Sequence, residues 1–307
     1  MYDNSLMGGG DFKSGFVTLI GRPNAGKSTL LNRIMGKKIA ITSSTAQTTR
    51  HRFRAVLTED DFQLILVDTP GLHKPHDALG EELNTSALKA LEDVDVVAML
   101  IDSSKEVGRG DEWVADQLRK CRAKKILVLS KCDLASTEQI EAQKKLACEL
   151  SDWDSIIACS AETGENVDAF VAQAVDLLPA GPKWFPDDME TDQPIEVVIA
   201  EFIREKILRS FRDEIPHAIG VQVEEMSYKK KSDMYKLRAI VYVERESQKG
   251  MIIGKGGSSI KRIGSEARTD LEQLLGTKVF LELSVKVKKN WRRDAAQIRR
   301  FGYGEGA

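Results

Sequence analysis

The chain has 307 residues, which is too long for one ordinary hydrophobic core, and 45 Lys and Arg against 47 Asp and Glu give it a net charge of −2. That total would argue against a nucleic-acid partner if the charge were evenly spread. Residues 1–189, however, carry 22 basic and 29 acidic side chains, whereas residues 190–307 carry 23 and 18. We therefore expect two domains of unlike charge, of which the second is basic.

The sequence predicts neither a membrane span nor a secretory signal. Its longest uninterrupted apolar run, residues 96–101, is far shorter than the roughly 20 residues that cross a bilayer. Residues 1–14 lack a basic segment followed by an apolar one, so we expect a flexible tail and a cytoplasmic protein. The cysteines form no C-x-x-C pair, which favours reduced thiols over disulfides or zinc: Cys121, Cys132, Cys148 and Cys159.

Short apolar runs alternate with helix-length segments through residues 15–181. This pattern is typical of a parallel sheet covered on both faces, and it predicts a doubly wound α/β domain of the P-loop NTPase class with a mostly parallel sheet. Such domains bind ligands at the carboxyl ends of the strands. The expected strands cover residues 16–20, 64–67, 94–101, 126–129 and 155–159.

A phosphate-binding loop follows the first expected strand and precedes a helical run. Glycines allow backbone N–H groups to face the phosphates, the lysine bridges the β- and γ-phosphates, and the final serine ligates Mg²⁺. Strand, motif and helix occur in the order that the motif requires. The motif G-x-x-x-x-G-K-[ST] comprises Gly21, Arg22, Pro23, Asn24, Ala25, Gly26, Lys27 and Ser28.

Three further motifs follow later strands. Asp68, Thr69, Pro70 and Gly71 come after the second strand, where a carboxylate can hold the metal and the Gly71 N–H can reach the γ-phosphate. An ordinary surface turn has a similar composition, so this motif indicates a metal site only because it follows a phosphate-binding loop in the sequence. The other two motifs follow the fourth and fifth strands: Ser130, Lys131, Cys132 and Asp133, and Ser160, Ala161 and Glu162.

The order of these motifs resembles the G-protein superfamily, which reads guanine with N-K-x-D and a later S-A-[KL]. The resemblance implies that Asp133 accepts hydrogen bonds from guanine and that the Lys131 stem covers the base. Ser130 stands where the family has Asn, and serine cannot supply both an amide donor and an acceptor. We expect GTP binding that is retained but weaker.

The basic half begins after a proline-rich linker, residues 182–194. Its sequence pattern predicts a helix, two strands, a glycine-rich turn, a second helix and a last strand, with a C-terminal tail at 291–307. The turn resembles the GXXG loop of KH domains, which clamps about four single-stranded nucleotides. The order resembles a type 2 KH domain over 195–290, with these RNA-binding candidates: Ile253, Gly254, Lys255, Gly256, Gly257, Ser258, Lys261 and Arg262.

Together the two halves resemble the Era family of bacterial ribosome-assembly GTPases. The resemblance implies that Thr49, in preference to its neighbour Thr48, closes onto Mg²⁺ with Ser28 and Asp68. It also implies that Lys27, Thr49, Gly71 and Asn24 carry out hydrolysis. Leu72 stands where signalling GTPases place a catalytic glutamine, and leucine cannot orient water. Relatives with this replacement hold K⁺ through the loop asparagine, here Asn24, so we expect K⁺-stimulated, slow hydrolysis.

The resemblance further implies binding of GTP and GDP, of 16S rRNA near its 3′ end and of the 30S subunit or its precursor, with a role in small-subunit biogenesis. Nucleotide-driven switch movements would expose or hide the KH groove. It also implies peripheral contact with the inner membrane. An alternative is a KH-type RNA chaperone whose P-loop domain senses nucleotide without significant turnover. An ATP-dependent kinase is disfavoured, because no lid or acceptor site is recognisable.

Several residues keep two interpretations. The histidines, His51, His73, His76 and His217, are more often surface or hydrogen-bonded residues than acids or bases. Lys229, Lys230 and Lys231 are more often a solvated turn than an RNA contact. The segment Trp291, Arg292 and Arg293 either extends the RNA-binding surface or packs the C-terminus.

Overall fold

The computed structural model describes residues 12–45, 47–75 and 77–303. Its contacts divide the chain into two units. The first ends at Asp192, and the second begins at Gln193 and also takes in Ile41–Thr48 and residues 77–79. Residues 1–11 of the expected tail, His76 and the last four residues lie outside the described part of the chain.

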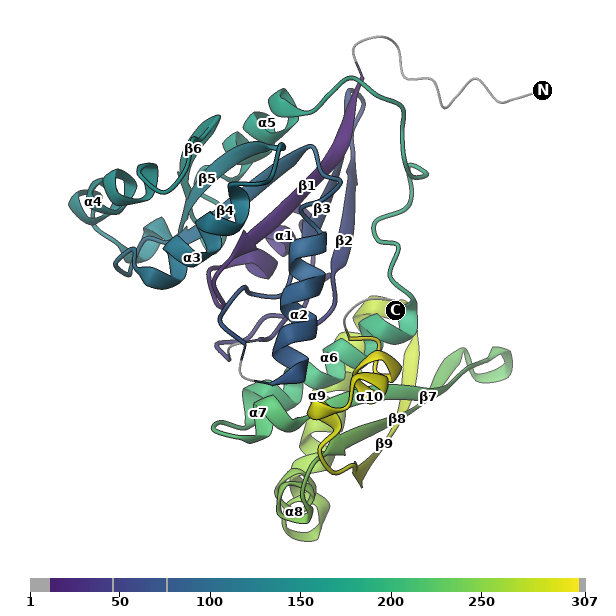
Figure 1. Cartoon of the computed structure of the whole chain (residues 1–307). Helices are drawn as coiled ribbons and strands as arrows, with labels where there is room; N and C mark the ends of the chain where they lie inside the picture. Colours follow the sequence, from purple (N-terminus) through teal and green to yellow (C-terminus); the bar gives the residue numbers. More distant parts are fainter. Residues whose placement is uncertain (1–11, 46, 76, 304–307) are drawn as a thin grey trace. The chain divides into compact units, whose positions relative to one another are not determined.

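The first unit is built on one six-stranded sheet, which confirms the predicted α/β class (Figure 1). All neighbouring strands are parallel except β2 and β3, which are antiparallel. The central strand β4 is buried almost along its whole length, as a strand covered on both faces must be. The order is β2 (Phe53–Thr58), β3 (Phe62–Asp68), β1 (Lys13–Gly21), β4 (Val96–Asp102), β5 (Lys124–Ser130) and β6 (Ser155–Cys159).

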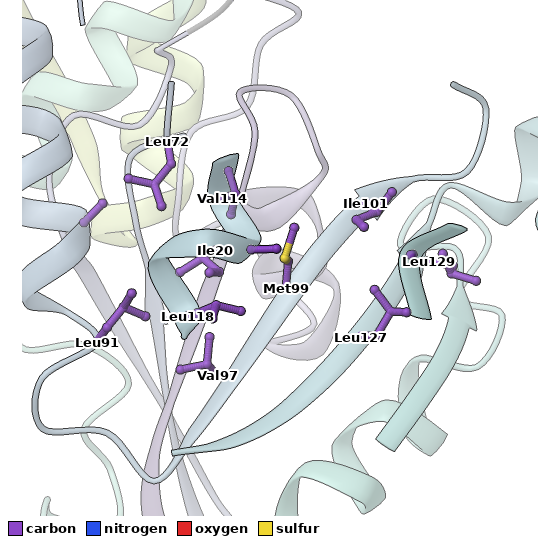
Figure 2. Packing of buried hydrophobic residues seen from close by; sticks show 13 residues of the cluster. Ile20, Leu72, Leu91, Val97, Met99, Ile101, Val114, Leu118, Leu127 and Leu129 are labelled. Carbon is purple, nitrogen blue, oxygen red and sulfur yellow. The ribbon is translucent and has the colours of Figure 1, made fainter. Parts of the chain in front are cut away.

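Helices cover both faces of this sheet. Successive strand residues point to opposite faces, so Val97, Met99 and Ile101 share one face and pack with α2, α3 and α4 (Figure 2). On the other face, α1 and α5 contact each other as well as the sheet. The helices are α1 (Lys27–Ile34), α2 (Ala78–Lys89), α3 (Arg109–Leu118), α4 (Thr137–Cys148) and α5 (Val167–Leu177).

The second unit has the element order of a type 2 KH domain. Its sheet runs β7-β8-β9, with β7 antiparallel and β9 parallel to β8, and α6 and α9 contact it and each other. The elements are α6 (Ile195–Ser210), α7 (Ile215–Ala218), β7 (Gly220–Lys229), β8 (Met234–Val243), α8 (Glu246–Ile253), α9 (Ser258–Leu275), β9 (Lys278–Val287) and α10 (Ala295–Arg300).

The structure differs from the sequence-based boundaries in three places. β1 begins at Lys13, inside the expected tail. The expected linker is held to the first unit up to Asp192, because Gln63 accepts hydrogen bonds from the backbone N–H groups of Trp184 and Phe185. The expected C-terminal tail is folded as far as Tyr303. No helix among the described residues is both long and apolar enough to span a membrane.

Candidate nucleotide site and RNA interface

The predicted phosphate loop connects the end of β1 to the start of α1. Gly26 caps α1 with a φ of 96°, a left-handed conformation that favours glycine. No acidic side chain occupies the first turn of α1, which lies wholly within the described chain, so its N–H groups are available to an anion. At Gly71, a Cβ would lie 2.6 Å from the Cα of Pro23, so glycine is what allows the 68–71 segment this close to the loop.

Lys27 is buried in the centre of the loop. Its Nζ donates to the carbonyl oxygens of Gly21 and Arg22, at 3.4 and 3.2 Å. Burial lowers the pKa of Lys27 to about 8, although the charge of Asp68 acts in the opposite direction. The loop therefore holds a partly desolvated cation where phosphate oxygens are expected.

Three oxygen-bearing side chains converge beside Lys27. The Ser28 hydroxyl donates to Asp68 Oδ2 at 2.6 Å, and Thr49 Oγ1 lies 2.9 Å from Ser28 Oγ and 3.2 Å from Asp68 Oδ2. The other carboxylate oxygen, Asp68 Oδ1, is buried and accepts no hydrogen bond among the described residues. Burial raises the pKa of Asp68 against the effects of Lys27 and the two hydroxyls. Two hydroxyls and an unsatisfied carboxylate oxygen are hard ligands of the kind that Mg²⁺ prefers.

A pocket of about 290 Å³ joins the phosphate loop to the two base motifs. Asp133 is exposed in this pocket, where a carboxylate can accept hydrogen bonds from a base. Lys131 has a φ of 59°, and its Nζ donates to Asp102 at 2.7 Å, which fixes its stem beside the pocket. The lining residues are Gly26, Thr29, Leu30, Ser130, Lys131, Asp133, Leu134, Cys159, Ala161 and Glu162.

Ser130 links the base motif to the phosphate loop. Its Oγ lies 2.7 Å from the carbonyl oxygen of Ala25 and 3.1 Å from that of Ile101. A hydroxyl has one proton, so it donates to one of these acceptors at a time. Serine thus provides the bond to the loop that one amide donor would provide.

Some predicted residues support the site rather than line it. Thr69 Oγ1 donates to Leu19 O at 2.8 Å, and Ser160 accepts from the Thr163 N–H at 3.1 Å. The Leu72 side chain lies in the hydrophobic core, while its N–H donates to Gly21 O at 3.1 Å (Figure 2). Cys132 is buried, and desolvation raises the pKa of its thiol to about 11, which keeps it protonated.

Two supporting residues were not predicted from the sequence. Asn84 on α2 donates to His73 O at 2.6 Å and thereby braces the segment after Gly71. Asp111 pairs with Arg22 of the phosphate loop at 3.1 Å. Both are polar residues inside amphipathic helices, so their contribution to the site becomes apparent only in the folded structure. Among the described residues, no group of three His, Cys, Asp or Glu side chains forms a further metal site.

In the second unit, the predicted GXXG loop joins α8 to α9. Gly254, Gly256 and Gly257 all have φ between 60° and 77°, and Lys255 is exposed. The first turn of α9, which is fully described, contains no acidic residue or side-chain cap, so its N–H groups can meet phosphate oxygens. Lys261 and Arg262 are exposed one turn later, while the neighbouring Ile263 is buried. The loop therefore presents backbone N–H groups, with exposed cations in the loop itself and one turn along α9.

The C-terminal segment packs on the second unit. Trp291 is fully buried and donates from Nε1 to Ala218 O at 2.9 Å, and Phe301 and Tyr303 pack beside it. Arg292 pairs with Glu244 at 2.9 Å. Of the two interpretations of residues 291–293, packing is therefore correct for Trp291, whereas Arg293 is exposed.

Comparisons with known proteins match both units. Residues 16–131 match the family described as 50S ribosome-binding GTPase, and residues 214–292 match the KH domain family. A crystal structure of an Aquifex aeolicus Era variant bound to GDP and AlF₄⁻ is similar with a TM-score of 0.92 and 36% identity, covering 95% of this chain and 100% of the other.

A second structure contains Era with MgGDPNP and nucleotides 1506–1542 of 16S ribosomal RNA. It gives the same TM-score and identity and covers 95% of this chain and 99% of the other. A match of this identity over both units confirms the predicted combination of a G domain and a type 2 KH domain. The chain belongs to the Era family of GTPases.

Proposed function

We propose that this protein is a GTP-hydrolysing switch that binds 16S rRNA and the small ribosomal subunit or its precursor through its KH domain, and that acts in small-subunit biogenesis. The observation that carries the proposal is the convergence of Lys27, the Ser28–Thr49–Asp68 oxygen set and the base pocket in one unit. The family description of the G domain mentions the 50S subunit. The relative matched over both units, however, holds a 16S fragment, which supports the small subunit.

Guanine selection is assigned to Asp133. Its carboxylate would accept hydrogen bonds from N1–H and the 2-amino group of guanine, whereas adenine offers neither of these donors. A bound adenine would cover the Asp133 carboxylate without giving it a hydrogen bond, and a polar group left without a partner in this way costs about 1–3 kcal/mol or more, which favours GTP over ATP. Binding competition between the two nucleotides measures this preference directly.

Hydrolysis would depend on charge placement around the γ-phosphate. Lys27 would bind the β- and γ-phosphates, Ser28, Thr49 and Asp68 would hold Mg²⁺, and the Gly71 N–H would bind a γ-phosphate oxygen. Bound Mg²⁺ would neutralise charge on the phosphates. The Leu72 side chain is turned into the core, so it offers no polar group to a water molecule.

The remaining charge in this proposal comes from K⁺ held by Asn24. Asn24 is exposed in the phosphate loop with a φ of 65°, and its amide oxygen is a suitable ligand for a monovalent cation. We expect slow turnover that is faster in KCl than in NaCl, and an Asn24→Ala variant that loses this difference. Equal rates in the two salts for the unmodified protein would remove K⁺ from the mechanism.

The alternative is an RNA chaperone that senses nucleotide without significant turnover. Steady-state GTP hydrolysis, measured with and without 16S RNA, separates the two functions. We expect turnover that RNA increases and that Lys27→Ala abolishes, while Lys120→Ala, a change at an exposed lysine, leaves it intact. GTP binding without turnover in the presence of RNA would favour the chaperone.

The proposed location is the cytoplasm, with peripheral contact at the inner membrane. The membrane contact rests on the family resemblance alone. Fractionation of cells with antibodies against the protein, before and after a high-salt wash, would measure the membrane-associated share.

A further inference from the structure

The turn between β7 and β8 carries cations that the proposed site does not use. We call residues 228–236 the basic turn. Lys229, Lys230 and Lys231 are consecutive and exposed, and no hydrogen bond or ion pair joins their side chains to another residue of the described chain. Lys236 lies further along β8, and the exposed Lys278 stands opposite Met234 in the sheet register. This end of the sheet is therefore a concentrated positive patch.

The one acidic residue in the basic turn is already engaged. Asp233 accepts a hydrogen bond from the Tyr228 hydroxyl at 2.6 Å, and Thr277 Oγ1 lies 2.7 Å from its carbonyl oxygen and 3.1 Å from Oδ1. The Tyr228 hydrogen bond is the main cause that lowers the pKa of Asp233, so the carboxylate stays charged without pairing with the three lysines. These contacts fix the shape of the turn and leave the lysines available.

Aromatic rings accompany the cations. The Tyr228 ring is 46% exposed and packs on Tyr235 with ring centroids 5.0 Å apart. Phe280 on β9 is 51% exposed and pairs with Lys236, on the opposite face of the sheet from the Tyr228–Tyr235 pair, so the tyrosines are the rings of this patch. Exposed rings among unpaired lysines form the combination that binds single-stranded nucleic acid, because bases stack on the rings and phosphates meet the cations.

The basic turn and the GXXG loop lie at opposite ends of α9. The GXXG loop leads directly into the first residue of α9. At the other end of the helix, Gly276 and Thr277 follow its last residue, and Thr277 donates a hydrogen bond to Asp233 in the basic turn. An 18-residue helix is about 27 Å long. The roughly four nucleotides that a GXXG loop clamps are too few to fill both sites.

We propose that the basic turn is a second RNA-binding site of the KH unit, which holds the single-stranded RNA that continues beyond the nucleotides at the GXXG loop. The inference depends on the proposed rRNA binding. It adds the position on the KH unit at which the longer RNA is bound. RNA suits the site better than an anionic lipid surface, because the fixed, partly exposed tyrosine offers a stacking platform beside the lysines.

The test compares a long and a short RNA on the full chain. The long probe is 16S RNA 1506–1542, the fragment bound to the relative. A set of short, overlapping fragments of this RNA is tested first, each slightly longer than the roughly four nucleotides that a GXXG loop binds. The short probe is the fragment that binds most tightly. The turn variant carries Lys→Gln at residues 229–231, and its charge-matched control carries Lys→Gln at Lys120, Lys144 and Lys145 in the first unit.

We expect the turn variant to bind the long RNA roughly tenfold more weakly, with the slope of log affinity against log salt reduced by about 2, since each phosphate contact contributes about 0.7. Its affinity for the short RNA should be unchanged, and the control variant should match the unmodified protein on both. Tyr228→Ala should weaken binding of the long RNA alone, and Tyr228→Phe, which keeps the ring but loses the bond to Asp233, should weaken it less.

Gly256→Asp separates this inference from the proposed function. No atom lies within 4 Å of a Cβ at Gly256, and aspartate tolerates the left-handed φ of 60° better than most side chains, so the change adds a negative charge to the GXXG loop with some backbone strain but no clash; it should weaken binding of both RNAs. If the unmodified protein does not bind the long RNA, the proposed function fails. If it binds while the turn variant keeps full affinity and salt slope, the basic turn is not an RNA site. Loss of binding to phosphatidylserine vesicles with RNA binding intact would assign the turn to a membrane instead.

Discussion

At the residue scale, Ser130 is the position where this chain departs from its family's base motif. Its hydroxyl retains the bond to the phosphate loop, but the second polar group of an asparagine is missing. We therefore expect Ser130→Asn to bind GDP and GTP several-fold more tightly, since one additional hydrogen bond contributes about 0.5–1.5 kcal/mol. Ser130→Ala should weaken binding by a similar amount because Ala25 O loses its partner.

Fluorescent guanine nucleotides would measure these affinities, with an adenine nucleotide as the control for base selection. Unchanged affinity in Ser130→Asn would mean that the loop contact alone is what this position supplies, and that the expected weakening is wrong.

The buried Lys27 lowers the stability of the nucleotide-free protein. Its pKa of about 8 against 10.5 means that Lys27 remains mostly charged at pH 7, and that burying this charge costs free energy relative to the unfolded chain. The unfolded chain binds this proton more tightly, so stability gains from deprotonation between about pH 8 and 10.5, and the full cost remains below pH 8. Lys27→Met should therefore stabilise the nucleotide-free protein at pH 7 by up to roughly 3 kcal/mol, less what Asp68 loses with its cation.

Urea denaturation at pH 7 and at pH 9.5 checks this expectation. The gain should shrink at the higher pH, and Lys120→Met, at an exposed lysine, should show no gain at either pH. A Lys27→Met protein that is less stable at pH 7 would mean that the contacts of Lys27 outweigh its desolvation.

At the element scale, regular patterns could be predicted from the sequence and packing-dependent ones could not. The sequence pattern predicts a strand over residues 234–243 and a helix over residues 258–275, and these are the bounds of β8 and α9, because each carries a clear apolar period and ends at turn residues. β2 was not predicted: its pairing with β3 gives a half-buried edge strand with a weak pattern. The C-terminal segment was expected to be a tail, because its fold depends on Trp291 and Phe301 finding distant partners.

The same distinction applies to the candidate site. Lys27, Ser28, Asp68 and Asp133 belong to motifs with fixed spacing, so the sequence places them, and the structure brings their elements together. Asn84 and Asp111 act on the site from helices whose sequence shows only a polar face. Their role follows from tertiary packing, which no local pattern encodes.

Helix α6 holds a charged cluster that its sequence would place at the surface. Arg204 is fully buried, pairs with Glu201, and donates to the Thr48 carbonyl, while Glu205 accepts from the Thr42 N–H at 3.0 Å. Removing one partner leaves a buried charge, so Arg204→Ala should destabilise the second unit by about 3–5 kcal/mol. The double variant Glu201→Leu, Arg204→Met should recover most of that loss.

Trp291 is a natural probe for this prediction, because the other three tryptophans lie in the first unit. With those three replaced by phenylalanine, urea denaturation followed by fluorescence would report the second unit alone. A single variant within about 1 kcal/mol of the parent would show that the cluster relaxes or admits water.

At the scale of the whole molecule, an acidic nucleotide-binding half and a basic RNA-binding half share one chain. The crystallised relative holds MgGDPNP and 16S RNA together, so both ligands fit on one such protein. For a switch, the two bindings must be coupled, and thermodynamics then requires the coupling to be reciprocal.

We therefore expect GDPNP to raise the affinity for 16S RNA 1506–1542, relative to GDP, by a factor in the range of about 5–150, and the RNA to raise the preference for GDPNP over GDP by the same factor. A ligand shifts a conformational equilibrium only by its differential affinity for the two states. The expected coupling therefore requires that RNA binds the state favoured by GDPNP better than the state favoured by GDP. Titrations of RNA at saturating GDP or GDPNP, and of each nucleotide with and without RNA, give the two factors independently. An adenine analogue at the same concentration is the control and should leave RNA affinity unchanged. RNA affinities that are identical with GDP and GDPNP would mean that the two halves bind their ligands independently, and hydrolysis would then not time the release of RNA.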